Sequence, residues 1–179
     1  MDRRLYLKFP TIEDKQAVLD FRKEFLEVGR EERIPGSGNL ENFENFEEWL
    51  TKAEREHNTE TCGEGRVPCT QYLTYRISDN KLVGIIQVRH SLNDFLLKFG
   101  GHIGDAVRPT ERRKGYAVEQ ILLALEKCKD LAIERALITC NRTNTASAKS
   151  IIKSGGKLEN EVEKEDGTIM QRYWIDIEK

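Results

Sequence analysis

The sequence predicts a mixed α/β (α+β) fold with a central, twisted sheet of about six to seven strands flanked by about four helices. Three observations support this. A strand, helix, strand unit lies in the C-terminal half, and the chain ends in two strands joined by an Asp-Gly turn. The N-terminal half alternates strand patterns with amphipathic helical patterns. At 179 residues the chain has the length of one ordinary domain, so we expect a single domain over 1–179.

The N-terminal half is predicted to contain three strands and two helices. Leu5, Leu7 and Phe9 alternate with polar residues, as a half-buried strand requires, and a helix follows Pro10. The remaining predicted elements are a helix at 43–57, a hairpin of 70–77 and 81–90 that turns at 79–80, and a short helix or turn at 91–99.

The C-terminal half begins with a strand that should stop near Arg108, because Pro109 lacks the N–H that a central strand needs. A compact apolar run at 136–140 indicates a buried, parallel strand beside the first. A second helix is expected from Asn144 to the pair Gly155-Gly156, followed by strands at 157–163 and 170–177. The helix between the two parallel strands should bury one stripe, made of Val118, Ile121, Leu122, Leu125, Cys128 and Ala132.

The turn at 107–117 joins the strand end to that helix through basic and small residues. The first turn of a helix has unpaired N–H groups and the positive end of the macrodipole, so it can bind a phosphate. Gly115 and Ala117 leave room for a diphosphate to approach the backbone, and three cations surround it. A solvated basic turn is the alternative, but cations at a helix start are unfavourable without an anion.

The six residues from Arg112 to Ala117, Arg-Arg-Lys-Gly-Tyr-Ala, resemble the acyl-CoA signature of the GNAT superfamily of N-acetyltransferases, in an uncharacterised bacterial-type branch. The preceding Val-x-Pro, the following helix and strand, and the helix that Asn144 opens have the order and spacing of that superfamily. Neither a Gly-x-Gly-x-x-Gly dinucleotide motif nor a P-loop string is present with the required spacing.

The resemblance implies that the chain moves acetyl from acetyl-CoA, its co-substrate, directly to a primary amine of a small molecule or protein. It places the acyl-CoA-binding core at about 100–156 and the wall of the acceptor site at about 29–69. It also implies a backbone N–H near Val107 or Arg108 as the oxyanion donor. The expected acetyl-CoA-binding residues are Val107, Arg108, Arg112, Arg113, Lys114, Gly115, Tyr116, Ala117 and Asn144.

Proton transfer is expected because an alkyl ammonium with a pKa near ~10 must lose a proton before it attacks a thioester. The tyrosine that GNAT enzymes commonly place seven residues after the motif asparagine is Ile151 here. His102, which lies on the strand that enters the turn, and Tyr173, on the last strand, are therefore the catalytic candidates, with structural roles as their alternatives. Weaker candidates are Glu161, Glu163 and His90.

Composition excludes several classes of partner. Charged residues make up 34% of the chain but cancel to a net charge of −2, so we expect neither nucleic-acid nor membrane binding. The four cysteines lack paired C-x-x-C spacing and no signal segment is evident, which predicts a cytoplasmic protein without a metal. Cys128 and Cys140 are expected in the core, whereas Cys62 and Cys69 could form a redox pair.

Three points stay open at this stage. The missing tyrosine also suits an acyl-CoA-binding sensor without turnover, and a structural interaction module with a vestigial turn is a third interpretation. Acidic residues at 41, 44, 47 and 48 would suit a cationic acceptor or a solvent-facing helix equally well. The resemblance includes many dimers, so a homodimer is one possible assembly.

Overall fold

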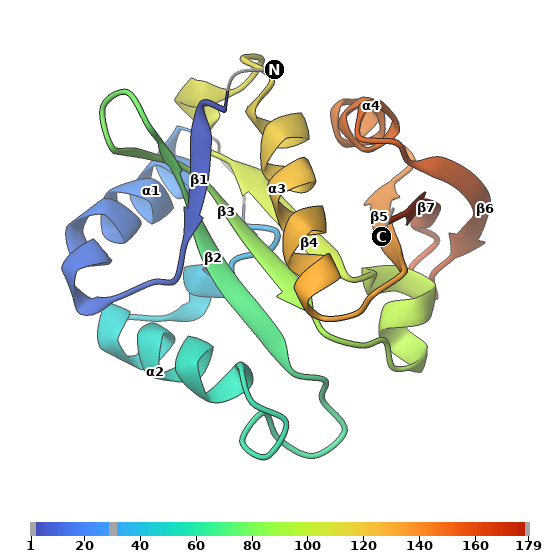
Figure 1. The fold of residues 1–179 in the computed structure, drawn as a ribbon, viewed down its shortest axis with the longest axis horizontal. Coiled ribbons are helices and arrows are strands. Elements are labelled where there is room, and N and C mark those ends of the chain that lie inside the picture. Colours follow the sequence, from blue (N-terminus) through green and yellow to red (C-terminus); the bar gives the residue numbers. More distant parts are fainter. Residues whose placement is uncertain (1–2, 29–31, 178–179) are drawn as a thin grey trace.

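The computed structural model describes residues 3–28 and 32–177 and shows a mixed sheet covered on both faces (Figure 1). Within these residues seven strands form one sheet in the order β1-β2-β3-β4-β5-β7-β6, which confirms the predicted fold class. All neighbouring strands are antiparallel except β4 and β5. The strands are β1 Leu5–Lys8, β2 Cys69–Arg76, β3 Lys81–Arg89, β4 Ile103–Val107, β5 Arg135–Asn141, β6 Lys157–Glu163 and β7 Ile169–Asp176.

Four α-helices of the described chain cover the sheet, two on each face (Figure 1). On one face α1 and α2 bury a cluster that includes Phe21, Phe25 and Trp49 against β2 and β3. On the other face α3 and α4 bury Ile121 and Ile151 against β5 and β7. The helices are α1 Lys15–Glu27, α2 Phe46–Glu56, α3 Tyr116–Asp130 and α4 Thr145–Lys153.

The shorter elements agree with the predicted turns. Segment 91–99 was expected as a short helix or turn, and a π-helical turn occupies Leu96–Gly100. Both hairpins turn through left-handed residues, Asn80 (φ 54°) and Gly167 (φ 79°). Asparagine and glycine adopt a left-handed φ at little cost. This explains why the residue pairs at 79–80 and 166–167 predicted the two turns correctly.

The buried stripe of α3 differs from the predicted one. Leu122 is 43% exposed, whereas Leu123 and Ala124 are buried, and Ala132 lies beyond the end of the helix. The reason is that α3 packs against β1 as well as β3 and β4, so its buried arc is wider than one apolar stripe. This arc includes the polar residues Glu119 and Gln120, which form buried hydrogen bonds.

Strands β4 and β5 are paired at one position only, Ile103 with Ile138. Strand β4 continues to Val107 against β3, and β5 continues to Asn141 against β7, so the two strands separate beyond this pair. The Arg108 N–H donates to the Val83 carbonyl, so even-numbered residues of β4 bond to β3. The backbone groups of Asp105 and Val107 consequently face the gap between β4 and β5.

Glu119 ties the start of the chain to α3. Its carboxylate accepts backbone N–H bonds from Arg4 at 2.6 Å and Leu5 at 2.9 Å, and it pairs with the Arg4 guanidinium. We expect Glu119→Gln to lower the free energy of unfolding by about 2 kcal/mol in urea denaturation, because an NH2 group then replaces the carboxylate oxygen that accepts from the Arg4 guanidinium. The exposed pair Arg3–Glu126 provides the control, and Glu126→Gln should change stability by less than about 0.5 kcal/mol. Equal effects of the two substitutions would contradict this role.

Candidate active site

The turn between β4 and α3 presents a row of unpaired backbone donors. Arg113 (φ 64°) and Gly115 (φ 82°) both have left-handed conformations, and Gly115 is the residue that precedes α3. No acceptor among the described residues binds the backbone N–H groups of positions 113–118. Converging free N–H groups at a helix start bind anions such as a diphosphate. The structure therefore has the strand, turn and helix start that the sequence predicted.

Several basic side chains of this turn hold the protein together. Arg108 pairs with Glu24 of α1 at 2.6 Å and also donates to the Leu82 carbonyl. Arg112 donates to the Val107 carbonyl at 3.2 Å, and its guanidinium lies 5.2 Å from the centre of the Phe25 ring. These contacts direct both guanidinium groups toward α1, so the backbone N–H groups are the better-placed anion donors.

Tyr116 and Lys114 also have partners within the protein. The Tyr116 ring is buried and lies beneath the guanidinium groups of Arg4 and Arg76. Lys114 pairs with the buried carboxylate of Glu111 at 2.7 Å. Ala117 packs against the small apolar cluster that contains Tyr116. These side chains, which were expected as acetyl-CoA contacts, shape the turn from which the N–H groups project.

Glu111 is the electrostatic centre of the turn. It is buried and accepts bonds from Arg76, Lys81 and Lys114, each at 2.7 Å. Burial raises the pKa of this carboxyl, but the bonds to Lys114, Lys81 and Arg76 outweigh burial and lower it to about 2. Glu111 therefore stays ionised at neutral pH and connects the turn to β2 and β3.

Asn144 caps α4, as the sequence predicted. Its side-chain oxygen accepts the Ser147 N–H at 3.1 Å, and the residue itself is exposed. Ile151, at the position of the usual tyrosine, is fully buried in the cluster between α4 and the sheet. The helix start is therefore available for a ligand, whereas position 151 contributes only packing.

His102 is buried at the entrance to β4. Its Nδ1 accepts the Leu137 N–H at 3.0 Å, and its ring lies 6.4 Å from that of Trp174. Burial and the nearby Arg89 lower the pKa of His102 to about 4. A neutral imidazole that accepts at Nδ1 carries its proton on Nε2, where it can donate but cannot accept. These contacts suit a hydrogen-bond donor better than a general base.

Tyr173 lies on the opposite face of the sheet from His102, because it packs with the α3 and α4 cluster whereas its neighbour Trp174 contacts His102. Its hydroxyl donates to Gln171 at 2.7 Å. Burial, with Cys140 and Glu161 nearby, raises the pKa of Tyr173. The structure thus does not bring the two predicted catalytic residues together.

Asp105 is a candidate that the sequence reasoning missed. It lies on β4 beside the gap, and its carboxylate accepts a bond from Gln120 of α3 at 2.8 Å. Burial raises the pKa of Asp105 to about 6, because no cation among the described residues pairs with it. A carboxyl with this pKa can accept a proton near neutral pH. The sequence signal was a lone acidic residue inside an otherwise apolar, glycine-containing strand.

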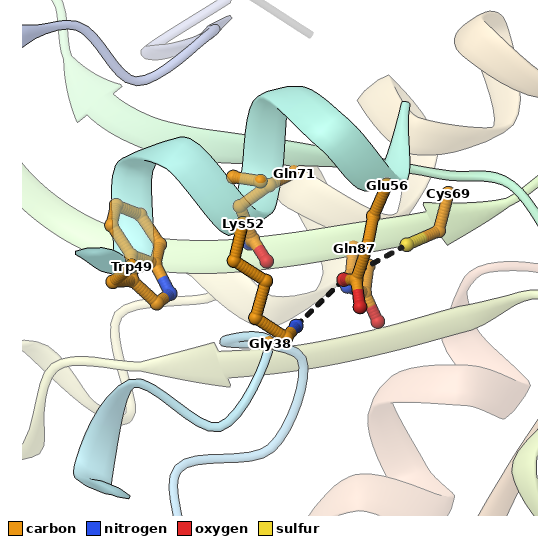
Figure 2. A pocket seen from close by; sticks show the side chains of 8 residues that line it. Gly38, Trp49, Lys52, Glu56, Cys69, Gln71 and Gln87 are labelled. Carbon is orange, nitrogen blue, oxygen red and sulfur yellow. Dashed lines mark hydrogen bonds and ion pairs between the residues drawn. The ribbon is translucent and has the colours of Figure 1, made fainter. Parts of the chain in front are cut away.

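A cavity of about 440 Å³ lies on the α2 face of the sheet, beside the entrance to β4. Figure 2 shows a separate, narrower pocket beside the cavity, too small to hold a water molecule, where Lys52 and Glu56 of α2 lie over Cys69 and Gln87 of the sheet. Burial and Glu56 raise the pKa of the Cys69 thiol to about 12, so Cys69 is no nucleophile at neutral pH. The charged and amide residues that line the cavity are Arg33, Lys52, Glu56, Arg66, Gln87 and Arg89.

A family profile described as an acetyltransferase (GNAT) domain matches residues 4–157. The chain belongs to the GNAT acetyltransferase family. The match includes β4, the turn at 107–117 and α3, so the predicted family resemblance is confirmed on the elements that suggested it.

Solved structures with this GNAT fold are numerous. An acetyltransferase from Salmonella typhimurium that modifies the N-terminal serine of ribosomal protein L7/L12 superimposes with a TM-score of 0.70 at 14% identity, over 99% of this chain and 97% of that one. A GNAT acetyltransferase from Bacillus anthracis gives 0.65 at 20% identity, over 100% and 98%. The microcin C7 self-immunity acetyltransferase MccE, in complex with acetyl-CoA and AMP, gives 0.68 at 14% identity, over 98% and 94%. No curated protein matches the sequence.

The four cysteines of this GNAT chain are free and buried. Cys128 and Cys140 lie in the α3 and α4 cluster, where small core residues were expected. Cys62 contacts the carbonyls of its own loop, and the Cys69 thiol contacts Glu56, so the two are not joined. Among the described residues no group of His, Cys, Asp and Glu could hold a metal ion, and no helix there is long and apolar enough to cross a membrane.

The Glu111 network predicts a pH-dependent loss of stability. We expect Glu111→Gln to lower the free energy of unfolding by about 2 kcal/mol at pH 7, since three cations lose their shared carboxylate. The folded pKa is depressed from 4.5 to about 2, so this contribution is complete above pH 4.5 and disappears as the pH falls toward 2. Urea titrations of both proteins between pH 2 and 7 measure the difference. A difference that is constant across this range would rule out the electrostatic origin.

Proposed function

We propose that this chain transfers acetyl from acetyl-CoA directly to a primary amine of a small molecule or protein. The observation that carries the proposal is the gap between β4 and β5, which leads to the turn with six unpaired N–H groups. Structural neighbours support the reaction type, because they include a spermidine N-acetyltransferase and an enzyme that modifies a protein N-terminal serine. Acetyl-CoA would supply the activated acetyl thioester.

The chain offers matching groups for each part of acetyl-CoA. The N–H groups of 113–118 would bind the diphosphate, and Asn144 lies at the start of the neighbouring helix α4. The Arg108 N–H already bonds to Val83, which leaves the Val107 N–H as the oxyanion donor that faces the gap. The core proposed at 100–156 contains all of these groups.

For the proton, we propose Asp105 as the acceptor and His102 as a donor. The Asp105 carboxylate has a pKa of about 6 and lies on the α3 side of the gap, so a proton from an amine on the α2 side would reach it through the gap, whereas Nδ1 of His102 is already engaged by Leu137. The thiolate that leaves is only moderately basic, so a separate acid is dispensable. Tyr173 remains a further candidate for protonating the sulfur.

The acceptor would enter from the α2 face, opposite the side on which α3 begins. The cavity there is lined mainly by described residues of the 29–69 segment, which supports the proposed acceptor wall; positions 29–31 lie outside the described residues. None of the acidic residues at 41, 44, 47 and 48 lines the cavity, and Glu47 pairs with Lys15. The charge of these residues therefore does not indicate a cationic acceptor.

We further propose a single domain over 1–179 that works in the cytoplasm. The family match from 4 to 157 and the continuous sheet support one domain, since β6 and β7 complete the same sheet. Four free cysteines suit a reducing compartment.

Thiol release in the presence of acetyl-CoA and a panel of amines tests the reaction. We expect release above background with at least one amine, and its loss in Gly115→Trp, because a side chain at φ 82° both strains the turn and fills the approach to the N–H groups. Gly167→Trp is the matched control, since Gly167 has φ 79° with open space around it, and should retain activity. Calorimetric binding of acetyl-CoA without any release would identify a sensor, and absent binding would identify a structural module.

Asp105→Asn tests the proton acceptor. We expect the kcat/KM of the wild type to decrease as the pH drops below about 6, because the carboxyl gains a proton. The variant should lack this decrease and should be about 100-fold slower. Because the folded pKa is raised from 3.8, ionised Asp105 destabilises the fold, so the variant should be more stable at pH 8 and equal to wild type near pH 3. Asp130→Asn, at the exposed end of α3, is the control. If the variant shows the same decrease in kcat/KM at low pH, Asp105 is not the base.

A further inference from the structure

The acceptor cavity has an excess of positive charge. Four cations line it against one carboxylate, that of Glu56. Glu56 is already shared, because Lys52 binds one of its oxygens at 2.6 Å and Arg66 binds the other at 2.7 Å. Arg33 and Arg89 therefore receive little compensation from Glu56. Two uncompensated guanidinium groups beside one cavity attract an anion.

Arg89 is the better positioned of the two guanidinium groups. It projects from the end of β3, and its Nη1 donates to the carbonyls of Gly100 and Gly101 at 3.1 Å each. Its Nη2 lies next to Gly104 of β4, and no carboxylate of the described residues pairs with it. Burial, together with the repulsion of Arg33, lowers the pKa of Arg89. Two carbonyls fix the side chain, while its second nitrogen stays available at the entrance to β4.

Gln71 carries an unpaired group in the narrow pocket beside the cavity (Figure 2). It is 3% exposed, and its Nε2 donates to the carbonyls of Gly36 and Ile86, which fixes the orientation of the amide. Its Oε1 is buried without a hydrogen-bond partner. A buried acceptor of this kind is costly, but the pocket around it is too small for a ligand, so Gln71 lies outside the proposed anion site.

We propose that the acceptor is a small amine that also carries a carboxylate or phosphate, with Arg33 and Arg89 binding the anion. This inference rests on the proposed acetyl transfer. The size of the cavity, about 440 Å³, suits a small molecule. Arg89 lies beside Gly104, one residue before Asp105, so the anion would lie close to the strand along which transfer occurs.

Direct titration tests the anion site without requiring turnover. The full-length chain saturated with CoA is titrated calorimetrically with two amines that carry an anionic group, β-alanine and O-phosphoethanolamine, and with their counterparts that lack it, β-alaninamide and ethanolamine. We expect at least one anionic amine to bind about tenfold or more tightly than its counterpart, and the preference to weaken with salt. The anion that binds more tightly distinguishes carboxylate from phosphate. Equal binding of the amines with and without the anionic group would overturn the proposal.

Arg33→Glu is the informative variant, because Arg33 is exposed and its replacement leaves the core intact. We expect it to abolish the preference for anionic amines, both in binding and in the ratio of kcat/KM values for thiol release. Arg55→Glu, on the exposed side of α2 and outside the cavity lining, should retain the preference. A preference that survives Arg33→Glu would contradict the assignment.

The two proposals fail in different ways. If the chain binds acetyl-CoA but releases no thiol with any amine, acetyl transfer is wrong, whereas the calorimetric preference still decides the anion site. If amines without an anionic group are acetylated as efficiently as those that carry one, the proposed acetyl transfer is supported and the anion site is wrong.

Discussion

Strand β4 divides its hydrogen bonds unequally between its two neighbours, and the rest of the site depends on this. Along its whole length it pairs with β3, but it meets β5 only at Ile103. A central strand normally satisfies both edges, since unpaired backbone groups away from water are costly. Here the backbone groups of Asp105 and Val107 face a gap in the middle of a seven-stranded sheet, and the Val107 carbonyl is bonded only by the Arg112 side chain among the described residues. The acetyl-CoA proposed above would bind along this gap.

Carboxylates from distant parts of the chain hold this incomplete strand in place. Glu111 clamps the turn after β4 to β2 and β3, Glu24 of α1 holds Arg108, and Glu119 fastens α3 to β1. Burial raises the pKa of Glu111 and Glu24, but their bonds to cations outweigh burial and lower it, so both remain ionised. Asp105 differs, because among the described residues its carboxylate accepts only from the neutral amide of Gln120, so it can exchange a proton where Glu111 and Glu24 cannot.

Local features of the sequence were predictable, and long-range ones were not. The turn at 107–117, the cap at Asn144 and the two hairpins follow from glycine, proline and asparagine at fixed positions, so short-range rules found them. The gap between β4 and β5 depends on the register of strands more than thirty residues apart. Likewise, Arg33 and Arg89 share a cavity only because a loop and a strand end meet, and the exposure of Leu122 follows from how α3 crosses β1, which no periodicity encodes.

The loop that carries Arg33 rests directly on β4, because Gly36 lies against Gly104: a Cβ on Gly36 would be 2.0 Å from the Gly104 carbonyl oxygen. One glycine-to-glycine contact therefore sets both the depth of the cavity proposed for the acceptor and the position of the strand that borders the gap. Enlarging residue 36 in order to change which acceptors bind would therefore displace β4 at the same time. Changes at the rim, at Arg33 or Arg66, leave that contact untouched and are the better route to altered selectivity.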